Sequence, residues 1–320
     1  MLTVQKFGGS SLADAEKLRR AADTVLSVRH RGQDVAVVVS AMGDTTDELI
    51  ALAHELNPDA DARELDALMS TGENQSAALL AIALERAGAR AISLAGWQAG
   101  VYTDDSHGGA ALELTFPSRA AAAIKDGIIP VVAGFQGVDI HGDVTTLGRG
   151  GSDTSAVALA AVLGADRCEI YTDVNGVYTA DPRLVPGARR VNEIDFRDML
   201  LLARAGSQVL HPGSVELAMR SGVELLVLSS AGEPGRTAVH MLDGARRPDF
   251  AGVTRSAEDQ TVTLVGAGCR SHTLPELASA LSAADIRVRG GRMGEGYASV
   301  RVDAEQLIFA LQTLHRYVFE

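Results

Sequence analysis

Residues Lys6 to Ser11 read KFGGSS, a lysine followed closely by two glycines and two serines. Lysine occurs elsewhere only at Lys17 and Lys125, and arginine supplies the rest of the positive charge. Lysine carries a compact charge, and neighbouring glycines let the backbone approach a ligand closely. Together with a helix N-terminus, for which Ser10 and Ser11 are candidate caps, the string indicates a phosphate site. An ordinary strand-to-helix turn with a solvated lysine is the alternative.

A second glycine-rich string lies far along the chain, where TTLGRGGSDTSAVALAAVLG runs from Thr145 to Gly164. It offers Arg149 beside two glycines, and Ser152 and Asp153 are candidate caps of the helix that follows. Neither string contains the P-loop pattern GxxxxGK[ST] or the dinucleotide fingerprint GxGxxG. The chain therefore has two glycine-rich helix starts, one with lysine and one with arginine, outside both motif classes.

Between these strings the chain alternates short apolar runs with helical patterns. The runs, which suit strands buried on both faces of a parallel sheet, are Val35–Ser40, Ala91–Leu94, Ile128–Ala133, Cys168–Thr172 and Val223–Ser229. The helical patterns are Asp14–Val28, Gln75–Ala87, Ser118–Lys125, Thr154–Leu163, Phe196–Ala205 and Ser214–Ser221. This alternation predicts a doubly wound α/β structure. The segment Val138–Gly148 predicts a hairpin, so the sheet can be mixed.

The last part of the chain has a different pattern of expected strands and helices. Residues 231–250 are rich in glycine, proline and arginine and are expected to link two domains and to hold a short strand or helix. Residues 251–320 then alternate extended and helical patterns within a short length. We expect a ferredoxin-like βαββαβ order there.

Composition excludes several classes of function. A net charge of −12 argues against a nucleic-acid surface, and no apolar stretch is long enough to span a membrane. The start of the chain lacks a signal-peptide pattern. Cys168 and Cys269 are isolated and expected to be reduced, which favours the cytoplasm. The histidines have no metal-binding spacing, so we expect no metal site made of side chains.

The two glycine strings and several further segments resemble the aspartate kinases of the amino-acid kinase family. The further segments are Val37–Ile50, Met69–Ala81, Gly96–Asp105, Ile129–Gly137, Tyr171–Arg183 and Gly206–Ala218. The resemblance implies a catalytic domain over residues 1–230, with a mainly parallel sheet, and one ACT-like regulatory unit over residues 251–320. That family usually has two ACT units, and this chain has length for one.

The resemblance also implies a reaction, namely transfer of the γ-phosphoryl group of ATP to the β-carboxylate of L-aspartate. This is the first step towards lysine, threonine and methionine, and it needs Mg²⁺ on the ATP phosphates. A carboxylate is already ionised at neutral pH and needs no general base. Positioning and electrostatic stabilisation therefore carry the catalysis. We expect the protein to form a homo-oligomer, and specifically a dimer.

Site residues follow from the same resemblance, motif by motif. Catalysis is expected from Lys6, which meets the ATP phosphates, and from Asp153, which orients it. ATP is expected to contact Lys6, Phe7, Gly8, Gly9, Ser10, Ser40, Thr172, Asp173, Tyr178 and Arg183. Aspartate is expected to contact Thr46, Glu73, Arg149, Gly150, Gly151 and Ser152. Arg149 can hold a carboxylate with two parallel hydrogen bonds, and Glu73 can supply the charge that an α-ammonium group requires.

Structural roles compete with some of these assignments. Glu73 can be a carboxylate near a helix N-terminus, Thr46 a helix N-cap, and Tyr178 a core aromatic residue. Gln208 stands where the family commonly has a lysine near the nucleotide phosphates. Two other functions stay open, a kinase of glutamate, carbamate or a nucleoside monophosphate, and a non-catalytic sensor of amino acids.

Overall fold

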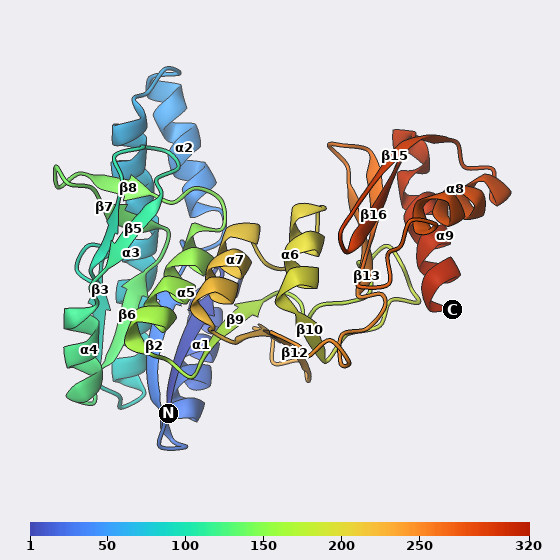
Figure 1. Ribbon diagram of the computed structural model, residues 1–320. Coiled ribbons are helices and arrows are strands. Elements are labelled where there is room, and N and C mark those ends of the chain that lie inside the picture. The colour runs from blue at the N-terminus through green and yellow to red at the C-terminus, as the bar shows by residue number, and fades with distance from the viewer. The chain divides into compact units, whose positions relative to one another are not determined.

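The computed structural model describes residues 1–113 and 115–320 in full, and of residue 114 only its place in a strand. The chain divides into two compact units. Unit 1 comprises residues 1–175 and 217–235, and unit 2 comprises residues 176–216 and 236–320. The chain thus leaves unit 1, returns to it once, and enters unit 2 again (Figure 1).

A parallel sheet forms the centre of unit 1. Its strands are β1 (Leu2–Phe7), β2 (Asp34–Val39), β3 (Ala91–Leu94), β6 (Ile129–Ala133), β9 (Arg167–Thr172) and β11 (Leu225–Ser229). They follow the order β11-β9-β1-β2-β6-β3, and every neighbouring pair is parallel. β2 is buried from Val35 to Val39, as a valine-rich strand covered on both faces should be.

Helices cover both faces of this sheet (Figure 1). On one face, α1 (Ala15–Arg29) and α3 (Ala62–Arg86) pack against each other and share a buried cluster with Phe7, Val37 and Val131. On the other face, α4 (Ser118–Lys125) contacts β2 and β6, while α5 (Gly151–Leu163) contacts β1, β2 and β9. The doubly wound α/β structure predicted from the alternating pattern is confirmed.

A smaller sheet in unit 1 has the order β5-β4-β7-β8. Its strands are β4 (Val101–Thr103), β5 (Leu112–Thr115), β7 (Gln136–Val138) and β8 (Val144–Thr146). β7 and β8 are antiparallel, so the expected hairpin is present. It belongs to this separate sheet, however, and the expectation that it makes the main sheet mixed is wrong. β8 packs against α3, and α3 also contacts α2 (Thr45–Leu56).

Unit 2 contains a four-stranded antiparallel sheet with the order β13-β14-β16-β15. The chain order is β13 (Gly252–Ser256), β14 (Thr261–Val265), α8 (Thr273–Ala283), β15 (Val288–Gly294), β16 (Tyr297–Val302), η2 (Ala304–Gln306) and α9 (Leu307–Phe319). A small α+β unit is therefore confirmed, but its order is ββαββα and not βαββαβ. The difference arises because the edge strand beside β14 is β13, which precedes β14 directly in the chain, and not a strand at the end of the chain.

The rest of unit 2 comes from two other parts of the chain. β10 (Glu193–Asp195) pairs in parallel with β12 (Arg236–His240), and α6 (Phe196–Arg204) contacts both strands. α7 (Pro212–Ser221) lies where the chain returns to unit 1. The expected linker, residues 231–250, contains β12, and the expected boundary at residue 230 does not coincide with the division into compact units. The assignment of functional domains stays a prediction.

Three local expectations are wrong. α3 begins at residue 62, far before the expected start at residue 75, because Asp61 caps it by accepting a hydrogen bond from the Arg63 N–H. α1 is capped by Asp14, which accepts from the Lys17 N–H, so neither Ser10 nor Ser11 is its cap. α5 starts at Gly151 without a side-chain cap, so Ser152 and Asp153 lie inside its first turn. None of the helices among the described residues is long and apolar enough to span a membrane.

Candidate active site

The expected site residues of unit 1 gather at the carboxyl ends of the parallel strands. Lys6 and Phe7 end β1, Ser40 follows β2 and its N–H bonds to the Phe7 carbonyl, and Thr172 ends β9. Ligands of doubly wound sheets bind at this edge. The turn after β1, residues 8–11, and the start of α5 meet there.

Lys6 and Asp153 form an ion pair that joins the two glycine-rich strings. The distance from Lys6 Nζ to Asp153 Oδ1 is 2.7 Å, and each side chain is 12% exposed. Asp153 lies in the first turn of α5, where the helix dipole stabilises a carboxylate. The pair therefore holds an ammonium group, still open to solvent, at the strand ends, and the contact between the two residues is the one that the family resemblance implies.

The first glycine pair has two different roles. A Cβ atom at Gly9 would lie 2.7 Å from the Ala41 carbonyl oxygen, so any larger residue would push the turn away from the loop after β2. A Cβ atom at Gly8 would instead lie 3.5 Å from Lys6 Nζ. Gly9 thus serves close packing, whereas Gly8 leaves space beside the ammonium group. Ser10, in the short helix η1 (Gly9–Ser11), is exposed.

The second glycine pair shapes the start of α5. Gly150 has a φ of 71°, which favours glycine, and a Cβ atom at Gly151 would lie 2.8 Å from the Phe135 ring. The turn places Ser152 in a buried position and leaves Arg149 exposed. No hydrogen bond or ion pair of the Arg149 guanidinium is formed with the described residues. Its five donors are therefore available to a carboxylate or a phosphate.

Glu73 is a buried carboxylate in the middle of α3, so the alternative that places it at a helix N-terminus is wrong. Only 3% of the residue is exposed. Its Oε1 accepts a hydrogen bond of 2.9 Å from the Ala41 N–H, whereas Oε2 has no partner among the described residues. Burial raises the pKa of Glu73 to about 7, although the Ala41 hydrogen bond opposes the shift. Such a group is suited to receive a cation.

Thr46 lies in the first turn of α2, near Glu73. Asp44 occupies the N-cap position of α2, so the alternative that makes Thr46 a cap is wrong. A Cβ atom at Gly72 would lie 2.8 Å from Ala41 Cβ and 3.5 Å from Thr45 Cγ2, which shows how closely α3 approaches this loop. The half-buried Thr46 therefore belongs to the segment that also contacts Glu73.

The expected nucleotide residues divide between the two units. In unit 1, Thr172 Oγ1 donates to Asp173 Oδ1 over 3.0 Å, and Asp173 is exposed. In unit 2, Tyr178 is half-buried, and the exposed Arg183 forms an ion pair with Asp181 at 3.0 Å. The nucleotide role of these four residues stays a prediction, as does the effect of Gln208, which is exposed in unit 2.

Sequence reasoning missed Asp66, which is fully buried on α3. Its carboxylate accepts hydrogen bonds from the Thr146 N–H (3.1 Å) and hydroxyl (2.6 Å), from the Gly108 N–H (3.0 Å), and pairs with His107 Nδ1 (3.0 Å). Thr146 ends β8 and is the second residue of the second glycine-rich string. Asp66 therefore positions the strand that leads to Arg149. The signal in the sequence was an acidic residue seven positions before Glu73, on the same face of a helix.

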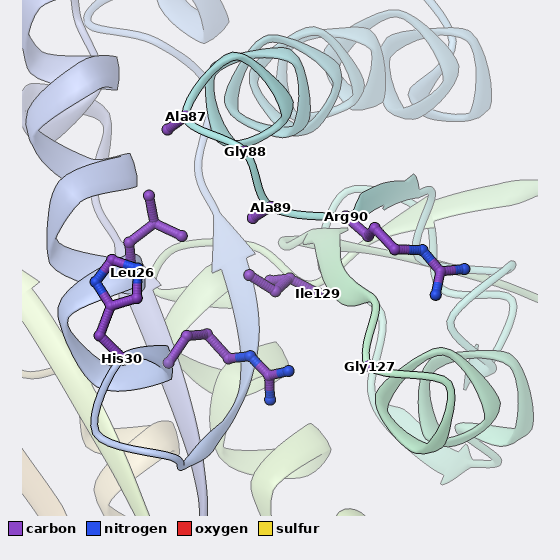
Figure 2. Close-up of a pocket in the computed structure, with 9 residues that line it drawn as sticks. Leu26, His30, Ala87, Gly88, Ala89, Arg90, Gly127 and Ile129 are labelled. Carbon is purple, nitrogen blue, oxygen red and sulfur yellow. The ribbon is translucent and has the colours of Figure 1, made fainter.

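A pocket of about 360 Å³ lies at the other edge of the main sheet (Figure 2). It is lined by Leu26, Arg29, His30, Ala87, Gly88, Ala89, Arg90, Gly127 and Ile129. Ile129 begins β6 and Arg90 precedes β3, so this is the amino-terminal edge of the strands. Arg29 pairs with Asp34, and Arg90 donates to the Asp126 carbonyl. The pocket is thus separate from the candidate active site.

Comparisons with known proteins agree with this geometry. Residues 1–229 match the amino acid kinase family. The aspartokinase of Corynebacterium efficiens is 47% identical over 291 residues, which cover 90% of this chain and 69% of that protein. The aspartokinase of Mycobacterium tuberculosis is 48% identical over 269 residues, which cover 83% of this chain and 64% of that protein.

Solved structures give the same result. The aspartate kinase of Synechocystis is 31% identical with a TM-score of 0.69, covering 99% of this chain and 69% of its own. Aspartokinase III of E. coli, in complex with aspartate and ADP, has a TM-score of 0.87 over the whole of both chains. At 23% identity, this second likeness concerns the fold. The resemblance found in the motifs is confirmed, and the chain belongs to the amino acid kinase family and, within it, to the aspartokinases.

Proposed function

We propose that this protein transfers the γ-phosphoryl group of ATP to the β-carboxylate of L-aspartate, giving 4-phospho-L-aspartate and ADP. The observation that carries the proposal is the Lys6–Asp153 ion pair of 2.7 Å at the carboxyl ends of the strands. It lies between two glycine-rich turns, in a chain whose relatives are aspartokinases.

The nucleotide phosphates fit beside Lys6. Gly8 leaves space next to the ammonium group, and a lysine can follow a phosphate as a mobile point charge. Mg²⁺ would supply further neutralisation of the phosphate charge, bound to phosphate and water oxygens. Asp153 holds the Lys6 ammonium group where charge develops on the transferred group. Thr172, Asp173, Tyr178 and Arg183 are proposed to contact the rest of the nucleotide.

The amino-acid substrate fits between Glu73 and Arg149. Glu73 Oε2 is buried without a partner among the described residues and would accept the α-ammonium group. The exposed Arg149 would hold a carboxylate with two hydrogen bonds. Thr46, Gly150, Gly151 and Ser152 would complete the substrate contacts.

The chemistry needs no general base. The β-carboxylate oxygen forms the new bond to the γ-phosphorus, while the bond from that phosphorus to the bridging oxygen of ADP breaks. The nucleophile is already ionised, so the protein positions two anions and neutralises their charge. This fits a candidate site that contains Lys6 and Arg149 as its cations. A dimer, a cytoplasmic location and a role in the synthesis of lysine, threonine and methionine are part of the same proposal.

Trapping of the product by hydroxylamine tests the proposal. Purified protein with ATP, Mg²⁺ and L-aspartate should form aspartyl hydroxamate, and L-glutamate should not replace aspartate. Lys6→Ala should abolish most of this activity, whereas Lys125→Ala, at an exposed site at the end of α4, should not. Activity with glutamate, carbamate or a nucleoside monophosphate in place of aspartate would identify another kinase. Aspartate binding without turnover would favour a sensor.

A further inference from the structure

His107, Asp139 and Asp143 form a cluster away from the Lys6–Asp153 pair. One ligand atom from each of the three side chains lies within 4.8 Å of those of the other two. His107 comes from the loop between β4 and β5, and the two aspartates come from the hairpin loop between β7 and β8. The cluster is not visible as a spacing in the sequence, because two separate loops of the small sheet contribute its residues.

His107 has the orientation of a metal ligand. Its Nδ1 lies 3.0 Å from Oδ2 of Asp66, a carboxylate that is fully buried and accepts three further hydrogen bonds. An acceptor of this kind selects the tautomer with the proton on Nδ1. The lone pair is then on Nε2, which bonds to none of the described residues. Carboxylates orient metal-binding histidines in this way.

Asp139 is a buried carboxylate that lacks a counter-ion. Only 5% of the residue is exposed. Its Oδ1 accepts hydrogen bonds from the N–H groups of His141 (2.9 Å) and Asp143 (2.8 Å), which fix the hairpin loop. Its Oδ2 has no hydrogen-bond partner among the described residues, and no arginine or lysine there forms an ion pair with it. This oxygen is therefore available to a cation at the cluster.

Asp143 completes the set. Its Oδ1 accepts hydrogen bonds from Nε and Nη2 of the Arg63 guanidinium. Its Oδ2 bonds to none of the described residues and remains for another partner. In all three residues, one atom is held by a neighbouring protein group, while another bonds to none of the described residues. This is the usual construction of a metal site, in which surrounding groups orient the ligands.

We propose that His107, Asp139 and Asp143 bind a divalent transition-metal ion such as Zn²⁺. One imidazole and two carboxylates suit zinc, whereas Mg²⁺ and Ca²⁺ prefer oxygen ligands alone. Zinc bonds of about 2.0–2.2 Å need ligand atoms that lie close together, and separations of at most 4.8 Å leave only small movements of the three side chains for binding. The bound ion ties the β7–β8 hairpin to the β4–β5 loop and to α3 through Asp66. β8 leads directly to Arg149, so the ion stabilises the substrate segment.

Metal titration of the full chain tests the proposal. Protein stripped with a chelator and dialysed should bind one Zn²⁺ per chain in competition with a chromophoric chelator. Co²⁺ should give the d–d absorption of a low-coordinate site. Asp139→Asn keeps the oxygen that accepts the two loop N–H groups and replaces the free oxygen with an amide. It should weaken Zn²⁺ binding at least about tenfold. His107→Asn, which can still donate to Asp66, should do the same.

His141→Ala is the matched control, because His141 is exposed in the same hairpin loop but is not part of the cluster. It should bind Zn²⁺ as the unmodified protein does. The thermal unfolding of every variant without metal identifies any variant that fails to fold. The proposal is overturned if the unmodified protein takes up no Zn²⁺, if both folded cluster variants bind as it does, or if the His141 variant alone loses binding.

Discussion

Replacement of Glu73 by glutamine should make the protein more stable at alkaline pH while it removes aspartate binding. Burial raises the pKa of Glu73 from its usual 4.5 to about 7. Each tenfold change in proton affinity is worth about 1.4 kcal/mol, so the ionised side chain costs the folded state about 3 kcal/mol. Glu73 is 3% exposed, so solvent screens little of this cost. Glutamine keeps an oxygen for the Ala41 N–H and carries no charge.

The way in which this stability changes with pH follows from the raised pKa of Glu73. A carboxyl group with a raised pKa in the folded state contributes stability below its unfolded pKa and loses that contribution as pH rises towards about 7. Glu73→Gln should therefore raise the free energy of unfolding by about 3 kcal/mol at pH 8, and by less than about 1 kcal/mol at pH 5.

Urea unfolding followed by tryptophan fluorescence measures this difference. Trp97 is the single tryptophan of the chain and lies in unit 1 with Glu73, so its signal reports the relevant unit. Glu48→Gln, at an exposed position in the first turn of α2, is the matched control and should show no such pH-dependent gain. If Glu73→Gln were no more stable than the unmodified protein at pH 8, the ionised Glu73 would not destabilise the folded state, and the expected burial effect would be refuted.

Further predictions concern catalysis and binding. Lys6→Ala should lower kcat by about 10²–10³ in a protein that still folds, because a positioned charge beside a developing anion is lost; near-normal turnover in a folded variant would refute its role. Arg149→Ala should raise KM for aspartate much more than KM for ATP, and equal effects would place Arg149 at the nucleotide. Aspartate binding should strengthen as pH rises through about 7 and should release a proton from Glu73, detectable by calorimetry in buffers of different ionisation enthalpy. Gln208→Lys should tighten nucleotide binding, and an unchanged affinity would show that position 208 does not face the phosphates.

The sequence was most informative where burial alone decides local structure. β3 and α4 have the predicted bounds, because short apolar runs and a clear helical pattern have few alternatives. The Lys6–Asp153 pair was also predictable, since both residues lie in glycine-rich strings whose motifs resemble one family.

Features that depend on distant contacts were not predictable. The first half of α3 contains the buried polar residues Asp66 and Ser70, which break an apolar pattern. The partners of the Asp66 carboxylate and of the Ser70 carbonyl lie in other segments. The strands of the small sheet are only three or four residues long, so they carry little periodic signal. The antiparallel pairing of the edge strand β13 with β14 depends on the whole sheet.

One face of α3 connects the segments that surround the proposed aspartate site. Asp66 holds Thr146 in β8, the Ser70 carbonyl accepts a hydrogen bond of 2.8 Å from Gln136 in β7, and Glu73 accepts from the Ala41 N–H after β2. These residues are spaced by four and three positions, so they point to one side of the helix. Each contact is polar and buried, and such contacts are directional where apolar packing is not. The helix therefore fixes the segment before Arg149 and the carboxylate of Glu73 in one rigid element. A substrate held at both ends needs a constant distance between Glu73 and Arg149. The polar face of α3 therefore stabilises the site geometry, although it buries the carboxylates of Asp66 and Glu73.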